Sequence, residues 1–174
     1  MKQTPSQTVG PYFAYGLTPQ QYNYDFPSHV DGNMVDPLTT PNTITIIGQV
    51  LDGEGKPIDD AMIEVWQNDG EKALFGRYGT GTDPNNRFIF NTIKPKSVNG
   101  QAPYVTFVVF MRGQLIHSFT RMYFSDETSL NKTDETLNSI PEHRRNTLIA
   151  KQNGNQYQFD IHMQGDLETV FFDI

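Results

Sequence analysis

The chain has no cysteine among its 174 residues. This absence excludes disulfides, zinc–thiolate sites, iron–sulfur clusters and thiol nucleophiles. No run of about 18 apolar residues is present, so we expect no transmembrane helix. The N-terminal sequence MKQTPSQTVGPYF lacks the apolar core of a secretory signal, from which we expect a cytoplasmic protein.

Positive charge is also scarce. The 13 basic and 20 acidic residues give a formal net charge of −7, and the longest basic cluster is His143-Arg144-Arg145. Nucleic-acid-binding proteins usually carry a basic patch, so no nucleic-acid partner is expected. With 36% hydrophobic and 19% charged residues, the composition is that of an ordinary globular domain.

The first 42 residues differ from the rest of the chain. They hold six of the eleven prolines and no lasting helical or alternating period, which predicts an extended N-terminal arm over 1–42. Disordered tails are poor in aromatic residues. The arm is rich in them, so we expect it to lie against another surface: Tyr12, Phe13, Tyr15, Tyr22, Tyr24 and Phe26.

Residues 43–174 carry the pattern of an all-β domain. Alternating or continuous apolar runs, separated by turn residues, predict about seven strands, which is typical of a β-sandwich. These runs are 43–52, 61–67, 87–91, 103–111, 117–124, 156–163 and 168–174. The glycine-rich stretch 76–83 is interpreted as a loop between strands.

Helix signals are few. Ser139 and Glu142 have capping-box spacing with Pro141 between them, which predicts one short helix through 143–146. Residues 126–138 can hold another turn or two. One or two short helices are therefore expected beside the sandwich.

The residues by themselves offer no catalytic or metal site. The four histidines share no metal-ligand spacing and are interpreted as surface or capping residues: His29, His117, His143 and His162. Serine-hydrolase and phosphate-loop motifs are absent. The acidic pairs Asp59-Asp60 and Asp126-Glu127 fall in turns and are interpreted as solvated loops.

One tripeptide of the arm is unusual. Gly10-Pro11-Tyr12 combines a rigid backbone with an aromatic ring that carries a hydroxyl group. Such a segment can line a pocket on another chain. Tyr12 can equally fasten the arm to the body of the domain, and composition alone leaves both readings open.

Several segments together resemble one family over nearly the whole length. They are TPSQTVGPYF (4–13), GQVLDGEGKPIDDAMIEVWQ (48–67), the run from TGTD to TIKP (80–95), APYVTFVVFMRG (102–113), TRMYFSDE (120–127), LNSIPEHRRNTLIA (137–150) and FDIHMQGDLETVFFDI (159–174). The combination resembles the protocatechuate 3,4-dioxygenase alpha-chain family, a branch of the intradiol ring-cleaving dioxygenases. The N-terminal segment and the ending ETVFFDI are its most specific parts.

The resemblance implies a function that this chain shares with a partner. Such enzymes are built from αβ protomers of related β-sandwich folds. They open protocatechuate between its two hydroxyl-bearing carbons with O₂ and Fe³⁺, giving 3-carboxy-cis,cis-muconate on the β-ketoadipate route of aromatic degradation. The resemblance places the iron in the beta chain, held by two tyrosines and two histidines.

The metal-ligand positions are degenerate in this chain. Tyr104 and Thr106 stand where catalytic chains of the family carry the two histidines of P-A-H-I-H-F, and no tyrosine follows TIKP within 92–103. Tyr78 lies in a G-R-Y sequence like that of one tyrosine ligand, but the segment fits a later loop better, so this match is interpreted as accidental. We therefore expect no metal and no catalytic residue in this chain.

The resemblance also implies residues that wall the partner's substrate pocket. Carried over by motif, they are Thr8, Gly10, Pro11, Tyr12 and Arg121. An arginine beside an anionic carboxylate is reasonable chemistry, but Arg121 can also be a surface strand residue paired with an acid. The connections after Trp66 and after Pro95 are shorter than is usual for the family.

An alternative reading remains. A metal-free β-sandwich could act as a homo-oligomeric binding or scaffold protein with a vestigial aromatic-acid pocket. A neighbouring gene for a chain with P-A-H-I-H-F favours the dioxygenase reading, whereas an isolated gene favours the scaffold. An independent enzyme is disfavoured because the ligands are missing.

Overall fold

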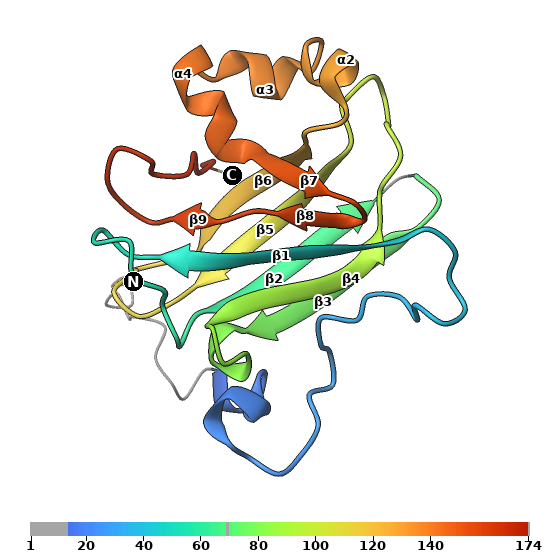
Figure 1. The fold of residues 1–174 in the computed structure, drawn as a ribbon. Helices are drawn as coiled ribbons and strands as arrows, with labels where there is room; N and C mark the ends of the chain where they lie inside the picture. Colours follow the sequence, from blue (N-terminus) through green and yellow to red (C-terminus); the bar gives the residue numbers. More distant parts are fainter. Residues whose placement is uncertain (1–13, 69, 174) are drawn as a thin grey trace, which may run out of the picture.

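The fold is a nearly closed β-sheet wrapped around one main apolar core (Figure 1). The computed structural model describes residues 14–68 and 70–173. Among these, the strands run in the order β3-β2-β5-β6-β7-β8-β1-β4, with β9 paired to β1. Their bounds are β1 Thr43–Leu51, β2 Met62–Asn68, β3 Ala73–Gly79, β4 Arg87–Ile93, β5 Tyr104–Phe110, β6 Ser118–Phe124, β7 Ile149–Asn153, β8 Gln156–Gln158 and β9 Ile161–His162.

The sheet bends into two layers. Strands β3, β2, β5 and β6 form one layer, β4, β1 and β8 form the other, and β7 joins them by pairing with both β6 and β8. Alternate residues point inward, so Val65, Phe107 and Ile46 are fully buried between the layers. Each such side chain contributes about 1.5–3 kcal/mol on burial. The β-sandwich prediction is therefore confirmed.

Short helices cover one end of the sheet, at the top of Figure 1. They are α2 Thr128–Asn131, α3 Glu135–Ser139, α4 Glu142–Arg145 and the 3₁₀ turn η3 Asn146–Leu148; further 3₁₀ turns are η1 Pro19–Tyr22 and η2 Thr80–Thr82. No helix in the described part of the chain is long and apolar enough to cross a membrane.

The helix boundaries differ from the prediction. Three short α-helices fill 128–145, where one or two were expected. Ser139 ends α3 rather than capping the next helix, and its hydroxyl donates to the Thr136 carbonyl. Pro141 directly precedes α4. The true capping residue is Asp134, whose carboxylate accepts from the Leu137 amide at the start of α3.

Five strands were predicted correctly, apart from shifts of one or two residues at their ends: β1, β2, β4, β5 and β6. The interpretation of 76–83 as a loop was wrong in part, because 76–79 belong to β3. Glycine is a poor strand residue, but a Cβ at Gly76 would lie 2.7 Å from Met34 Cγ. The glycine is therefore required by a neighbour that is distant in sequence.

The C-terminal predictions also need correction. The run 156–163 splits into β8 and β9, because Asp160 between them accepts the Gln49 amide hydrogen with its carboxylate. The segment 168–173 forms no strand; a single bridge joins Phe172 to Phe119. Strand β7 was missed by the sequence analysis.

A segment from the N-terminal region fills the gap between β3 and β4, the two outer strands of the sheet. We call residues 31–34 the closing segment. The Arg77 amide donates to the Asp31 carbonyl (3.1 Å), the Asn91 amide donates to the Gly32 carbonyl (2.8 Å), and the Met34 amide donates to the Asn91 carbonyl (2.9 Å). A Cβ at Gly32 would lie 2.1 Å from the Ile89 carbonyl oxygen, so only glycine fits here.

Candidate functional site

Arg121 lies on the outward face of β6, away from the main core. It is paired across the ladder with Thr106 of β5, and Tyr104 is paired with Tyr123 in the same way. Because side chains alternate along a strand, all four project from the same side of the sheet. Tyr104 and Thr106, which were predicted to be degenerate metal-ligand positions, and the predicted pocket arginine are therefore neighbours.

Aromatic rings hold the Arg121 guanidinium. Its central carbon lies 4.2 Å from the centroid of the Tyr104 ring and 5.7 Å from that of Phe172. Nη1 is buried and has no hydrogen-bond partner among the described residues. A guanidinium fixed by cation–π contacts with an unsatisfied donor is a suitable partner for a carboxylate. Among residues 14–68 and 70–173, Arg121 forms no ion pair with an acidic side chain within 4.0 Å.

A buried polar network supports this arrangement. The Tyr123 hydroxyl donates to Asp134 Oδ1 (3.2 Å), and Asp134 also accepts from the amides of Ala102 (2.9 Å) and Leu137 (2.8 Å). Burial raises the pKa of Tyr123 to about 12, Asp134 adds to the shift, and Arg121 opposes it. Tyr123 therefore stays protonated at neutral pH and fixes the base of the site.

The donors around Tyr104 do not fit a ferric ion. The described residues contain no group of three or more His, Cys, Asp or Glu side chains that could hold a metal. His117 lies at the other end of β5, with its ring 5.5 Å from that of Phe110. Tyr78 pairs with the buried Ile63 and points to the inner face, opposite to Tyr104. These two tyrosines cannot share a metal.

The same outward side of the sheet carries apolar rings, which we call the aromatic face: Trp66, Phe75, Phe110, His117 and Phe119. The Trp66 and Phe75 rings lie 4.3 Å apart, and those of His117 and Phe119 lie 4.7 Å apart. Trp66 is 51% exposed, and the adjoining turn exposes Leu115 and Ile116 by 69% and 74%. An exposed tryptophan among half-buried rings, next to two exposed aliphatic side chains, is typical of protein interfaces.

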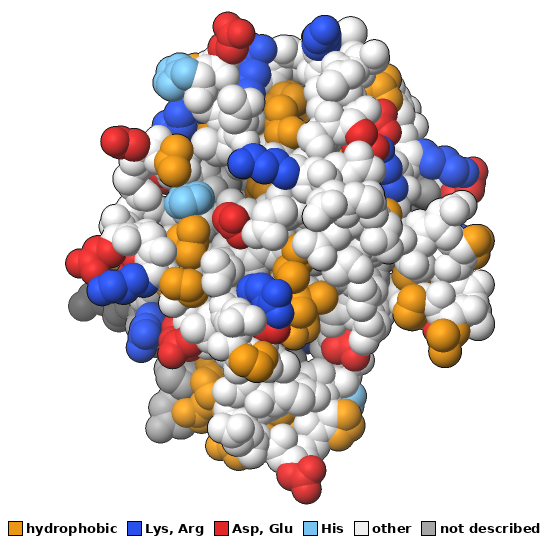
Figure 2. Space-filling model, viewed as in Figure 1, with side chains coloured by type: hydrophobic (Ala, Val, Ile, Leu, Met, Phe, Trp, Pro, Cys, Tyr) orange, Lys and Arg blue, Asp and Glu red, His pale blue; other side chains and the backbone are white. Residues whose placement is uncertain are grey.

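Figure 2 shows a face of the molecule on which basic and acidic side chains are interspersed, without a large area of one sign.

Four residues predicted to wall the substrate pocket cannot be placed. Thr8, Gly10, Pro11 and Tyr12 lie outside the described residues.

Sequence reasoning missed Phe172 and Asp134 as parts of the site. Phe172 was assigned to a last strand, and Asp134 to a helical turn without a role. The N-cap pattern of Asp134 before α3 was a readable signal. The contact of Phe172 with Arg121 depends on how the C-terminal segment returns to β6, which no local pattern encodes.

Comparison with known proteins gives full-length relatives. No protein-family model matches the chain. It is 45% identical to the protocatechuate 3,4-dioxygenase alpha chain of Burkholderia cepacia, over 100% of this chain and 98% of that protein. Identity to the alpha chain of Pseudomonas putida is 37%, covering 99% and 97%. The beta chain of B. cepacia is 30% identical over 70% of this chain and 64% of its own length.

Solved structures agree on the fold. An intradiol ring-cleavage dioxygenase from Tetranychus urticae superposes with a TM-score of 0.61 at 15% identity, over 83% of this chain and 94% of that one. A dioxygenase domain from Streptomyces sp. SirexAA-E gives 0.58 at 20% identity, over 97% and 100%.

The B. cepacia alignment spans 194 positions for 174 residues, so about 20 positions are occupied in the relative alone. Identity of this extent over both full lengths shows that the chain belongs to the protocatechuate 3,4-dioxygenase alpha-chain family.

Proposed function

We propose that this chain is the non-catalytic alpha subunit of a protocatechuate 3,4-dioxygenase and works with a beta chain that carries Fe³⁺. The observation that carries the proposal is the pair Tyr104 and Thr106, which replaces two histidines while the rest of the chain keeps its alpha-chain similarity. The complete site is expected to open the protocatechuate ring with O₂. This chain supplies shape and polar contacts.

Arg121 is the residue of this chain that we expect to contact substrate. Its buried Nη1 has no partner among the described residues, and Tyr104 and Phe172 fix the guanidinium plane. A substrate carboxylate would satisfy this donor with a charge-assisted hydrogen bond. Such a contact holds the ring in one orientation before any bond changes.

The aromatic face is the surface that we expect the beta chain to cover. It lies on the same side of the sheet as Arg121, so a partner whose pocket receives Arg121 must approach this side. Trp66 projects from β2 on this face and is half exposed. Tryptophan and arginine are enriched among residues that dominate binding energy at interfaces.

The arm completes the proposal. By its resemblance to the family, we expect Thr8, Gly10, Pro11 and Tyr12 to wall the pocket in the beta chain. The Tyr12 hydroxyl would then hydrogen-bond the substrate carboxylate, and the Gly-Pro backbone would pack on the ring.

Co-expression with a tagged beta chain tests the proposal. We expect the two chains to co-purify in equal amounts and to consume O₂ when protocatechuate is added, whereas this chain alone consumes none. Trp66→Ala should weaken co-purification at least tenfold, because it removes a large ring from the interface. Leu38→Ala, which shortens a 93% exposed residue away from that face, is the matched control. Activity of this chain alone would contradict the proposal.

A further inference from the structure

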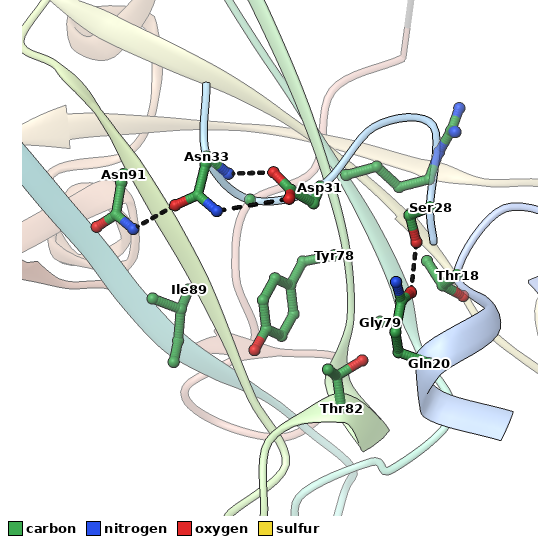
Figure 3. A pocket seen from close by; sticks show the side chains of 12 residues that line it. Thr18, Gln20, Ser28, Asp31, Asn33, Tyr78, Gly79, Thr82, Ile89 and Asn91 are labelled. Atoms are coloured by element: carbon green, nitrogen blue, oxygen red, sulfur yellow. Dashed lines mark hydrogen bonds between the residues drawn. The ribbon is translucent and has the colours of Figure 1, made fainter. Parts of the chain in front are cut away.

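A second site lies at the open edge of the sheet, where the closing segment meets β3 and β4 (Figure 3). A hollow of about 340 Å³ is present there. Its volume is within the range that holds one small organic molecule. The Tyr78 side chain projects into the middle of the view, with Asp31 and Asn33 on one side and Thr82 on the other.

One wall of the hollow is apolar and the other is polar. The Tyr78 ring and the Ile89 side chain provide the apolar surface. On the polar side, Asp31 accepts from the Asn33 amide (2.7 Å), and the Asn33 side chain accepts from the Asn91 amide group (2.8 Å). This chain of hydrogen bonds fixes the polar groups in position.

Two hydroxyl groups of the lining are free to meet a ligand. Neither the Tyr78 nor the Thr82 hydroxyl has a hydrogen-bond partner among the described residues. Burial raises the pKa of Tyr78, so its hydroxyl remains a donor at neutral pH. Thr82 is exposed and Tyr78 is half-buried, so both hydroxyl groups can exchange a hydrogen bond with water for one with a ligand.

The charge of the lining selects against anions. Asp31 is the one carboxylate of the hollow and Arg77 its one base. The Arg77 side chain is engaged elsewhere, because its Nε and Nη2 both donate to Glu64 Oε1 (2.9 and 2.6 Å) on the outward face. The hollow is therefore left with an uncompensated negative charge, which repels carboxylates and favours O–H donors.

We propose that this hollow binds a small neutral hydroxylated aromatic compound, with its ring against Tyr78 and Ile89 and a phenolic hydroxyl donating to Asp31. Phenolic O–H groups are strong donors, and a carboxylate is the strongest acceptor available in the lining. Arg121, for which a carboxylated ring is proposed above, lies on another face of the sheet. The inference does not depend on the proposed enzyme function.

Titration of the ¹⁵N-labelled full chain with catechol tests the inference. We expect saturable shifts of the amide signals of Gly32, Asn33 and Ile89 at millimolar catechol. Under the same conditions 3,4-dihydroxybenzoate, which adds a carboxylate to the same diol, should bind there at least tenfold more weakly. Absence of saturable shifts at these amides, or equal affinity for the two compounds, would overturn the proposal.

Two variants in the hollow and one control outside it sharpen the test. Tyr78→Phe should weaken catechol binding about fivefold, because it deletes one hydrogen bond and keeps the ring. Tyr24→Phe removes a hydroxyl from an exposed tyrosine outside the hollow and should leave the affinity unchanged. Asp31→Asn should reduce the discrimination against 3,4-dihydroxybenzoate. Unchanged affinity in Tyr78→Phe together with unchanged discrimination in Asp31→Asn would show that the hollow is not the binding site.

Discussion

The Arg121 region and the Tyr78 hollow are built differently on one sheet. Arg121 projects from β6 inside the sheet and is fixed by two rings and by the Asp134–Tyr123 network behind it. The hollow lies at the open edge and depends on a few backbone hydrogen bonds from the closing segment. One region presents a cation whose Nη1 has no hydrogen-bond partner among the described residues, and the other presents an uncompensated carboxylate.

This difference shows how the same scaffold can separate ligands by charge. Strand β6 is hydrogen-bonded to β5 on one side and to β7 on the other, so the backbone that carries Arg121 is held in a fixed position. An edge needs cover, and here that cover also forms the wall of a cavity. The Arg121 region is therefore expected to act within a complex, while the hollow needs nothing beyond this chain.

Arg121→Ala should give the largest effect, because it removes the cation that distinguishes the first region. In the complex with a beta chain, kcat/KM for protocatechuate should fall about 100-fold, as is usual when one partner of a desolvated charge pair is lost. O₂ uptake measures this loss. Arg112→Ala, which removes an exposed arginine paired with Asp60, should keep kcat/KM within about twofold. Equal kcat/KM for both variants would contradict the role of Arg121.

Gly32→Ala should displace the closing segment and so disrupt the Tyr78 hollow. The new methyl group would lie 2.1 Å from the Ile89 carbonyl oxygen and 2.9 Å from Tyr78 Cδ2, so the closing segment must move. We expect a loss of about 2–3 kcal/mol in the free energy of unfolding, measured with urea. Gly16→Ala meets nothing within 4 Å and should change it by less than about 0.5 kcal/mol. If the two variants are equally stable, the closing segment does not seal the edge as described.

Acid should weaken the edge through Asp83, next to Thr82 at the rim of the hollow. The Arg87 side chain donates to Asp83 and lowers its pKa to about 2. A carboxyl with a lowered folded-state pKa stabilises the fold above its unfolded pKa of 3.8, and this contribution is lost as pH falls from about 4 to about 2. The loss should be about 1–2 kcal/mol, since Arg87 is partly exposed.

Urea unfolding of Asp83→Asn at several pH values checks this expectation. The variant should be less stable at pH 7 and lose less stability between pH 4 and pH 2 than the parent chain. The same pH slope in both proteins would rule out the ion pair as its source.

Tyr123→Phe should give the smallest effect and concerns the support of Arg121. Asp134 keeps its two backbone donors, so about 1 kcal/mol of stability should be lost. The raised pKa of Tyr123, about 12, means that its contribution is complete below pH 10 and disappears between pH 10 and 12. The pKa of Tyr78 is also raised, so ultraviolet titration should show one fewer late-ionising tyrosine in the variant than in the parent chain. Equal numbers of late-ionising tyrosines in the two proteins would exclude Tyr123 as one of them.

Local sequence pattern predicted β1, β2, β4, β5 and β6 and failed where distant contacts decide. Strands β1 and β5 have clear apolar patterns, and both were predicted. Strand β3 was not predicted, because the glycine-rich stretch from Gly76 was interpreted as a loop, although Met34 requires a glycine there. The run 156–163 looked continuous because the bond from Gln49 to Asp160 is invisible in sequence.

The candidate site was predictable in part. Arg121, Tyr104 and Thr106 came from family resemblance, and strand register explains why they meet. Phe172 and the hollow could not be predicted, because one depends on the return of the C-terminal segment and the other on the path of residues 31–34. Both are products of chain topology.

The central claim is that this chain shapes a site whose metal belongs to its partner. Iron content per chain, measured on this chain alone and on its active complex after both are produced in iron-rich medium, tests it most directly. We predict no iron and no protocatechuate-dependent O₂ uptake for the chain alone, and one iron per αβ pair with full uptake in the complex. Stoichiometric iron with tyrosinate absorbance in the chain alone would contradict the account.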